Sequence, residues 1–254
     1  MRKYSNYRKK TILNRKIIVL TTKYMEFIVK KHYLRRRLEK IHIYSNMIKN
    51  IIFDLGGVLT LLDPGEALRR FKALGVENPE EYINPYCQNG PFFEFENGDI
   101  SAEQFCSELE KICKRPVSCE EAKNAWCGFI TSVHEEYLNY LQQFRPRYRL
   151  GVLSNTNPFI QSWAETADFT SNGKPLSSYF DMLFFSFRMR ASKPGEEIYR
   201  KMLLEGNMKP EETLFIDDSE KNIETARRLG IGTLKVNNGE DWRPMLDRIL
   251  LADR

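Results

Sequence analysis

Short apolar runs alternate with helical patterns over much of the chain, and this alternation restricts the fold more than any other feature. Helical stretches between the later runs include PGEEIYRKMLLEG and SEKNIETARRLG, which end at Gly206 and Gly230 as helix C-caps commonly do. Strand–helix–strand alternation predicts an α/β fold, with a Rossmann-like parallel sheet and helices on both faces. The runs expected to form strands are NIIFD (50–54), RLGVLS (149–154), DMLFFS (181–186), TLFIDD (213–218) and GTLKV (232–236).

The pattern changes between the first and second of these runs. Residues 62–145 contain no convincing strand pattern. Ser101 with Gln104 and Ser118 with Glu121 have the spacing of helix capping boxes, and an apolar stripe of helical periodicity follows each. Such stripes form core packing more often than a cofactor site. We therefore expect a small helical bundle inserted into the α/β domain.

The first 46 residues differ in charge from the rest of the chain. They hold fourteen Lys and Arg against Glu26 and Glu39, a net charge of +12, whereas the remainder holds 25 basic and 32 acidic residues, a net of −7. A basic arm of this kind is able to bind nucleic acid or anionic lipid. We favour a poorly ordered extension, or one translated from an upstream start, because Met47 lies just before the first expected strand.

The predicted organisation therefore has three parts. They are a basic extension (1–46), an α/β core (47–61 and 146–254) and a helical cap (62–145). No apolar run approaches the roughly 20 residues that a membrane-spanning helix needs, and no signal peptide is visible. We expect no membrane partner and a cytoplasmic location.

Cysteine and histidine are too scattered for a zinc site or for most histidine-dependent mechanisms. No C-x-x-C pair occurs, and His134 is the only histidine after residue 46. We expect the cysteines to be small buried hydrophobes in a reducing cytosol. They are Cys87, Cys106, Cys113, Cys119 and Cys127.

Polar side chains collect where the expected strands end. In open parallel sheets, ligands bind outside the carboxyl ends of the strands. An Asp after a strand is often only a turn or a helix cap, but two adjacent acids joined by a third are costly unless a cation binds. Oxygen ligands without histidine suit Mg²⁺. The groups at these ends are Asp54, Ser154, Asn155, Lys193, Asp217 and Asp218.

Four segments resemble, in order, the four motifs of the haloacid dehalogenase-like hydrolase superfamily. They are IIFDLGGVLT, LSNTN, the KP of SKPGEEIY, and FIDDSEKNIETA. The resemblance spans residues 48–236, and the helical insertion lies where that family places its mobile cap. Within the family the chain is most similar to bacterial sugar phosphatases of the alpha-D-glucose-1-phosphate phosphatase type, which share D-L-G-x-V and L-S-N-T-N.

The resemblance implies roles for the residues that match its motifs. Asp54 would attack phosphorus and form an aspartyl-phosphate that water later hydrolyses. Lys193 would neutralise charge on this nucleophile and on the phosphoryl group. Ser154 and the neighbouring Asn155 amide would bind phosphate oxygens, and Gly57 would let the backbone turn beside them.

The resemblance also implies a magnesium site. Its ligands would be Asp54, the Gly56 carbonyl and Asp218, with Asp217 binding directly or through water. Many phosphatases of the family have a second Asp at the position of Gly56, which protonates the leaving oxygen. Because glycine lacks that group, the general acid is left open between a cap residue, water and a substrate hydroxyl.

These expectations lead to one function and several rivals. The favoured function is a Mg²⁺-dependent phosphomonoester hydrolase for a small sugar phosphate or related metabolite, over which the cap closes. A metal-independent haloacid dehalogenase uses the same nucleophile, but its family lacks the paired acids Asp217 and Asp218. A non-catalytic phosphate-binding protein is the other alternative. Nucleic acid as a partner rests on residues 1–46 alone and is not favoured, and the sequence does not indicate an oligomeric state.

Overall fold

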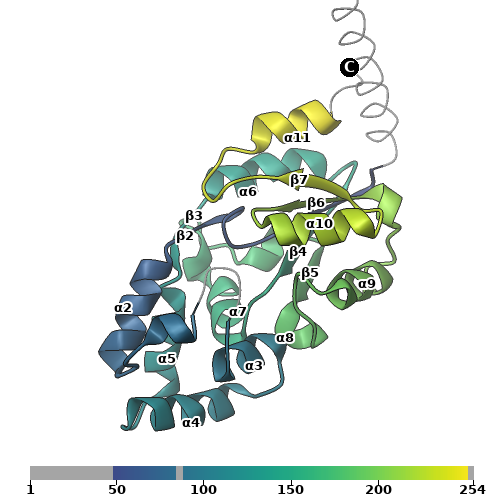
Figure 1. Cartoon of the computed structure of the whole chain (residues 1–254). Coiled ribbons are helices and arrows are strands. Elements are labelled where there is room, and N and C mark those ends of the chain that lie inside the picture. The colour runs from purple at the N-terminus through teal and green to yellow at the C-terminus, as the bar shows by residue number, and fades with distance from the viewer. Residues whose placement is uncertain (1–47, 84–87, 251–254) are drawn as a thin grey trace, which may run out of the picture. The chain divides into compact units, whose positions relative to one another are not determined.

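The computed structural model describes residues 48–83 and 88–250, and the basic extension over 1–46 lies outside these ranges. Five parallel strands form one sheet in the order β5-β4-β1-β6-β7 (Figure 1). This sheet confirms the predicted α/β class, and every expected strand is present. The strands are β1 Asn50–Phe53, β4 Arg149–Ser154, β5 Met182–Phe185, β6 Thr213–Asp217 and β7 Gly232–Lys235.

Two helices cover one face of the sheet. Ile52, Leu153 and Phe215, one from each central strand, pack in a single buried cluster with residues of α9 (Glu196–Glu205) and α10 (Glu220–Arg228). Burial on both faces explains why β1 continues after Asn50 with three successive apolar residues instead of alternating apolar and polar ones. Because β1 is packed on both faces, its C-terminal end is held in a fixed position.

The opposite face is covered by α6 (Glu135–Leu141) and by the segment that leads into α11 (Arg243–Leu250) (Figure 1). The Trp242 ring lies 5.2 Å from the Phe53 ring, centroid to centroid, and 5.1 Å from that of Tyr137. Helix α6 falls within the stretch expected to form the cap, yet through Trp242 it packs on the sheet.

The remaining helices either belong to the insertion between the first two strands of the main sheet or connect later strands of that sheet (Figure 1). Both capping boxes are present, at Ser101 and Ser118. No helix of the described ranges is long and apolar enough to cross a membrane. The α-helices are α2 Pro64–Leu74, α3 Pro91–Asn97, α4 Ala102–Cys113, α5 Cys119–Cys127, α7 Pro158–Ala164 and α8 Ser186–Met189; the 3₁₀ helices are η1 Pro79–Glu81, η2 Gln142–Phe144, η3 Ala167–Phe169, η4 Leu176–Ser178 and η5 Pro210–Glu212.

Two short, paired strands were not predicted. Residues Ile130–Val133 form β3, which pairs antiparallel with β2 (Thr60–Leu62), so the expectation of no strand within 62–145 is wrong. The central residues of β3 are the polar, exposed Thr131 and Ser132. A four-residue run without apolar alternation gives no strand pattern, and its partner lies about 70 residues earlier in the sequence.

The helices from α2 to α5 share an aromatic core. Its rings are buried, and the centroids of contacting rings lie 4.6 to 6.3 Å apart, which is the usual range for aromatic pairs. These contacts give the insertion a hydrophobic core of its own. The rings belong to Phe71, Phe92, Phe95, Phe105 and Trp126.

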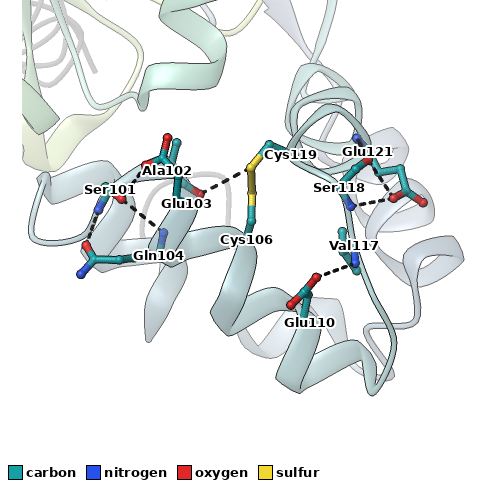
Figure 2. The surroundings of a disulfide bond; sticks show 10 residues. All are labelled: Ser101, Ala102, Glu103, Gln104, Cys106, Glu110, Val117, Ser118, Cys119 and Glu121. Carbon is teal, nitrogen blue, oxygen red and sulfur yellow. Dashed lines mark hydrogen bonds between the residues drawn. A yellow bond between two sulfur atoms is a disulfide. The ribbon is translucent and has the colours of Figure 1, made fainter.

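A disulfide joins Cys106 of α4 to Cys119, the first residue of α5 (Figure 2). The prediction that the cysteines are free is therefore wrong for this pair, although Cys113 and Cys127 are free and half-buried, and Cys87 lies outside the described residues. The two Cα atoms lie 5.8 Å apart, within the range that a disulfide spans. A spacing of 13 residues does not reveal this proximity, because it depends on how α4 and α5 pack.

Candidate active site

Lys193 joins the ends of three strands. Its Nζ lies 2.8 Å from Oδ2 of Asp54, after β1, and 2.8 Å from Oδ2 of Asp217, at the end of β6. It also donates to the Leu153 carbonyl of β4 at 3.0 Å. All three donors of the ammonium group thus have protein partners, which they need because the residue is only 4% exposed to water. This geometry fixes the position of one positive charge beside the expected nucleophile.

Asp54 lines a pocket at the end of β1. Its Oδ1 accepts a hydrogen bond of 2.7 Å from the Leu55 backbone, and its Oδ2 faces Lys193. Burial raises the pKa of Asp54 well above its usual value; Lys193 opposes this rise, and the nearby Asp217 and Asp218 add to it. An ionised, nucleophilic Asp54 consequently needs positive charge nearby.

The carboxylates of Asp54, Asp217 and Asp218 offer oxygens that lie within 4.8 Å of one another. Burial, together with Asp217, raises the pKa of Asp218 to about 6. When all three are ionised, one lysine leaves this cluster with a net charge of −2. A hard divalent cation with oxygen ligands fits both the donor atoms and the charge.

The two acids of the FIDD motif differ in exposure. Asp217 is fully buried, and its Oδ1 accepts from the Ser219 backbone at 2.7 Å and from Asn222 Nδ2 at 3.0 Å. Asp218 instead lines the pocket. Asp217 therefore holds Lys193 from behind, while Asp218 faces the space that a ligand would occupy.

Asp218 leaves no room for a side chain at Gly57. The φ of Gly57 is +76°, and a Cβ there would overlap Oδ2 of Asp218. Gly56 lines the pocket, whereas Gly57 does not. The structure thus shows that Gly57 makes room for Asp218; its predicted part in the turn beside the phosphate stays a prediction.

Asn155 grips the backbone of Lys193. Its Oδ1 accepts from the Lys193 amide at 2.8 Å, and its Nδ2 donates to the Lys193 carbonyl at 2.9 Å. Both Asn155 and Ser154 also line the pocket, at the end of β4. The Asn155 side chain is thereby occupied with positioning the lysine, a role that the sequence does not predict.

The pocket is closed by residues that the sequence did not single out. Glu96 of α3, Trp126 of α5, Phe129 and Gln88 line it from the inserted segment, and Asn222 lines it beside Asp217. The position of Asn222 could have been predicted from FIDDSEKN, because an Asn five residues after Asp217, in the first turn of the following helix, can reach back to that acid. Glu96 has no such signal, since it is one of several acids in PFFEFENGD.

The model of the haloacid dehalogenase-like hydrolase family matches residues 48–230. The chain belongs to the haloacid dehalogenase-like hydrolases. This match includes the whole segment from Asp54 to Asp218, so the charged cluster lies within the family's own region.

Several members of the family are closely similar to this chain. The D-ribitol-5-phosphate phosphatase of Bacteroides thetaiotaomicron is 42% identical over 204 residues, which are 80% of this chain and 99% of the relative. A HAD-like family hydrolase from Porphyromonas gingivalis has a structure with a TM-score of 0.77 and 43% identity, covering 80% of this chain and 98% of that one.

Another solved relative carries ligands. It is a HAD family enzyme from Bacteroides thetaiotaomicron in complex with magnesium and inorganic phosphate, with a TM-score of 0.71, 34% identity, and coverage of 78% of this chain and 98% of that one. An L-2-haloacid dehalogenase is also similar, with a TM-score of 0.50 and 17% identity. At that identity the likeness concerns the fold alone.

Proposed function

We propose that the chain is a Mg²⁺-dependent phosphatase that hydrolyses the phosphate monoester of a small sugar or sugar alcohol. The observation that carries this proposal is the buried Lys193 ammonium held between Asp54 and Asp217, with Asp218 facing the pocket. This arrangement brings together a nucleophile, a fixed positive charge and a place for a divalent cation at the C-terminal ends of the strands. The D-ribitol-5-phosphate phosphatase among the relatives supports it.

Asp54 would act as the nucleophile. Its carboxylate attacks phosphorus, the bond from phosphorus to the leaving oxygen breaks, and an aspartyl-phosphate forms. Lys193 holds the attacking carboxylate in place and balances the charge that gathers on the phosphoryl oxygens. Ser154 and the Asn155 backbone amide would bind those oxygens. Water then attacks the phosphorus and releases Asp54.

Magnesium would be held by Asp54, Asp218 and the Gly56 carbonyl, with Asp217 binding directly or through water. The ion would supply positive charge to the phosphoryl oxygens. The oxygen-only donor set and the excess of negative charge in the cluster both support this ion. Lys193, which remains in contact with the acids, would then have to balance only part of the charge.

The wall of the pocket suits a short chain that carries several hydroxyl groups. Trp126, Phe129 and Ile130 supply apolar surface, while Gln88 and Glu96 supply polar groups. A mixture of this kind fits the carbon backbone and the hydroxyls of a sugar alcohol. Ribitol 5-phosphate, the compound in the name of the relative from Bacteroides thetaiotaomicron, is therefore the first substrate to test.

The test is a phosphate-release assay with ribitol 5-phosphate, glucose 1-phosphate and p-nitrophenyl phosphate, with Mg²⁺ or with EDTA. We expect turnover that EDTA abolishes and Mg²⁺ restores. Asp54→Asn keeps the shape of the side chain and removes its charge, so turnover should disappear, whereas Asp168→Asn on the exposed surface should behave as wild type. Full activity in EDTA, or in the Asp54→Asn variant, would contradict the proposal.

A metal-independent dehalogenase is the rival enzyme. An L-2-haloacid dehalogenase has a similar fold, and the resemblance to the family implies the same nucleophile for both reactions. The buried and occupied Asp217, and Asp218 beside it, have no task in attack on carbon. Halide release from 2-chloropropionate in EDTA, without phosphate release from any ester, would favour the rival. A protein that binds phosphate but hydrolyses none of the esters would favour a non-catalytic role.

We place the reaction in the cytoplasm. Charged phosphate esters do not cross a bilayer readily, because burying a charge away from water is costly, so they stay where they are made. The disulfide between Cys106 and Cys119 weighs against this location, since the cytosol keeps most thiols reduced. Rapid alkylation of intact cells, followed by mass spectrometry of these two cysteines, decides whether the bond exists in the cell.

A further inference from the structure

The proposed reaction lacks a proton donor. A sugar or sugar alcohol leaves as an alkoxide, which is a strong base, so breaking its bond to phosphorus needs a general acid. Gly56, two residues after the nucleophile, has no side chain to serve. The described residues that line the pocket include four ionisable groups, Asp54, Lys193, Asp218 and Glu96. The first three are committed to attack, charge balance and the cation.

We propose that Glu96, which the cap helix α3 supplies, is the general acid and base of the reaction. It protonates the leaving oxygen in the first step and accepts a proton from the attacking water in the second. This inference rests on the proposed phosphatase function and assigns to it the one ionisable group in the described pocket lining that has no other task.

The position of Glu96 suits in-line displacement. Asp54 attacks phosphorus from the strand edge, so the leaving oxygen points away from it, toward the opposite wall. A proton donor must therefore face Asp54 across the pocket without touching it. Glu96 lines that pocket from the cap, and among the described residues it forms no hydrogen bond or ion pair with Asp54 or Lys193.

The C-terminal end of α3 is fixed to the core at three successive residues. The Glu96 carbonyl accepts a hydrogen bond of 2.6 Å from Ser186 Oγ, and Asn97 Oδ1 accepts one of 3.0 Å from Ser192 Oγ. Gly98 lies so close to the backbone of α8 that a Cβ there would overlap it. Glu96 is thus held on the catalytic core, although it belongs to a helix of the cap.

Ser186 links the acid to the phosphate end of the site. Its Oγ accepts from the Thr156 amide at 3.0 Å, and Thr156 directly follows Asn155. One hydroxyl thereby sets the distance between Glu96 and the strand end where Ser154 and Asn155 lie. Fixing a catalytic group through such supporting contacts is what keeps it within reach of the reacting atom.

The protonation state of Glu96 agrees with this role. Burial raises its pKa to about 8, so the carboxyl holds a proton at neutral pH. A general acid works best when its pKa lies near the working pH, because it then both carries a proton and releases it readily. An ordinary exposed glutamate would already be ionised and have no proton to donate.

Protons and bonds balance over the two steps. In the first, a bond forms from Asp54 to phosphorus, the bond to the leaving oxygen breaks, and the Glu96 proton passes to that oxygen. In the second, water gives a proton to Glu96 and its oxygen bonds to phosphorus, while the bond to Asp54 breaks. Glu96 ends protonated, and the sum is ester plus water giving alcohol plus phosphate.

The experiment compares two esters in the Glu96→Gln variant by rapid mixing in Mg²⁺. p-Nitrophenyl phosphate leaves as a stabilised phenolate and needs no acid, whereas ribitol 5-phosphate leaves as an alkoxide. We expect the nitrophenolate burst of the variant to stay within about threefold of wild type, followed by slow turnover. Phosphorylation by ribitol 5-phosphate should fall by about 10²- to 10⁴-fold, as for loss of a general acid.

Glu94→Gln is the matched control. Glu94 lies on the same helix two residues earlier, is exposed and is absent from the pocket lining, so both rates should equal those of wild type. The burst amplitude counts the competent active sites, which separates loss of chemistry from loss of folded protein.

Two results would overturn the inference. Equal slowing of phosphorylation by both esters would show that Glu96 does not act on the leaving group. A raised KM for ribitol 5-phosphate with an unchanged rate constant would make Glu96 a residue that binds substrate hydroxyls. A wild type inactive on every ester would instead contradict the phosphatase function itself, so the two failures are distinguishable.

Discussion

Lys193 is the residue through which the charges of the site are connected. Burial alone lowers its pKa, but Asp217 and Asp54 more than reverse this and raise it above the usual value, so the side chain stays charged. Lys193→Met keeps the length of the side chain and removes the charge. We expect turnover to fall by about 10²- to 10³-fold, the usual cost of losing one preorganised charge.

The same change should also lower stability. It leaves Asp54 and Asp217 buried without their partner, and breaking a buried ion pair costs about 3–5 kcal/mol. Activity is therefore measured below the melting temperature of the variant, on protein whose circular dichroism matches wild type. Lys209→Met, at an exposed lysine, is the control. Unaltered kinetics in Lys193→Met would mean that the lysine is structural.

Gly57 allows a matched pair of substitutions. Gly57 and Gly173 have the same φ of +76°, but a Cβ at Gly173 meets nothing within 4 Å, while one at Gly57 meets Asp218. Gly173→Ala should lose only the roughly 1 kcal/mol that a positive φ costs. Gly57→Ala should lose that and also displace Asp218, which raises the Mg²⁺ concentration needed for half-maximal activity. An equal Mg²⁺ requirement in the two variants would contradict this.

The sequence predicted the groups of the site better than their tasks. Asp54, Lys193 and Asp218 could be placed at one edge because parallel strands end together. Their catalytic roles stay predictions. The grip of Asn155 on the Lys193 backbone could not be foreseen, since it depends on the distance between two loops. Glu96 was missed because its position depends on how the cap packs.

At the scale of elements, periodicity identified what is locally encoded. The five strands of the main sheet and both capping boxes follow from apolar runs and from short-range spacing. Strand β3 and the bond between Cys106 and Cys119 do not, because each depends on a partner distant in sequence. Local patterns thus predicted the elements, and packing decided the rest.

The boundary of the cap is one such question of packing. We propose that the cap ends near β3 rather than at residue 145, because α6 packs through Tyr137 on Trp242, which in turn contacts Phe53 of β1. The two-stranded sheet of β2 and β3 would then be the double connection between cap and core. Limited proteolysis that cuts after α6, near residue 145, and leaves α6 with the cap fragment would contradict this boundary.

The disulfide should stabilise the α4–α5 pair. A cross-link across 13 residues restricts the unfolded chain, by about 3 kcal/mol for a loop of this size. Cys106→Ser should lower the melting temperature in the absence of reductant, and the difference from wild type should shrink with dithiothreitol. Cys113→Ser, at a free cysteine of the same helix, should show no such dependence on reductant. If the difference in melting temperature between Cys106→Ser and wild type were the same with and without reductant, no disulfide would form in the wild type.

At the scale of the whole molecule, the charged cluster couples stability to the cation. Three carboxylates facing one ammonium repel each other, and a ligand that binds only the folded state stabilises it, by about 2.7 kcal/mol at one hundred times its Kd. Mg²⁺ should therefore raise the melting temperature of the wild type. Asp218→Asn should be more stable than wild type in EDTA, because one repelling charge is gone, and should gain little from Mg²⁺. An Asp218→Asn variant with a lower melting temperature than the wild type in EDTA would contradict this account.

The attachment of α3 at Glu96, Asn97 and Gly98 has a consequence for the motion of the cap. Because these contacts tie the end of α3 to α8, a substrate cannot enter by swinging the whole bundle away without breaking them. In hydrogen–deuterium exchange, the amides of this last turn should open almost as rarely as those of β1. Helix α4, which lies far from the sheet and packs on α3 and α5, should exchange first (Figure 1). The cap would then loosen from its outer edge inward, while its catalytic corner keeps its place.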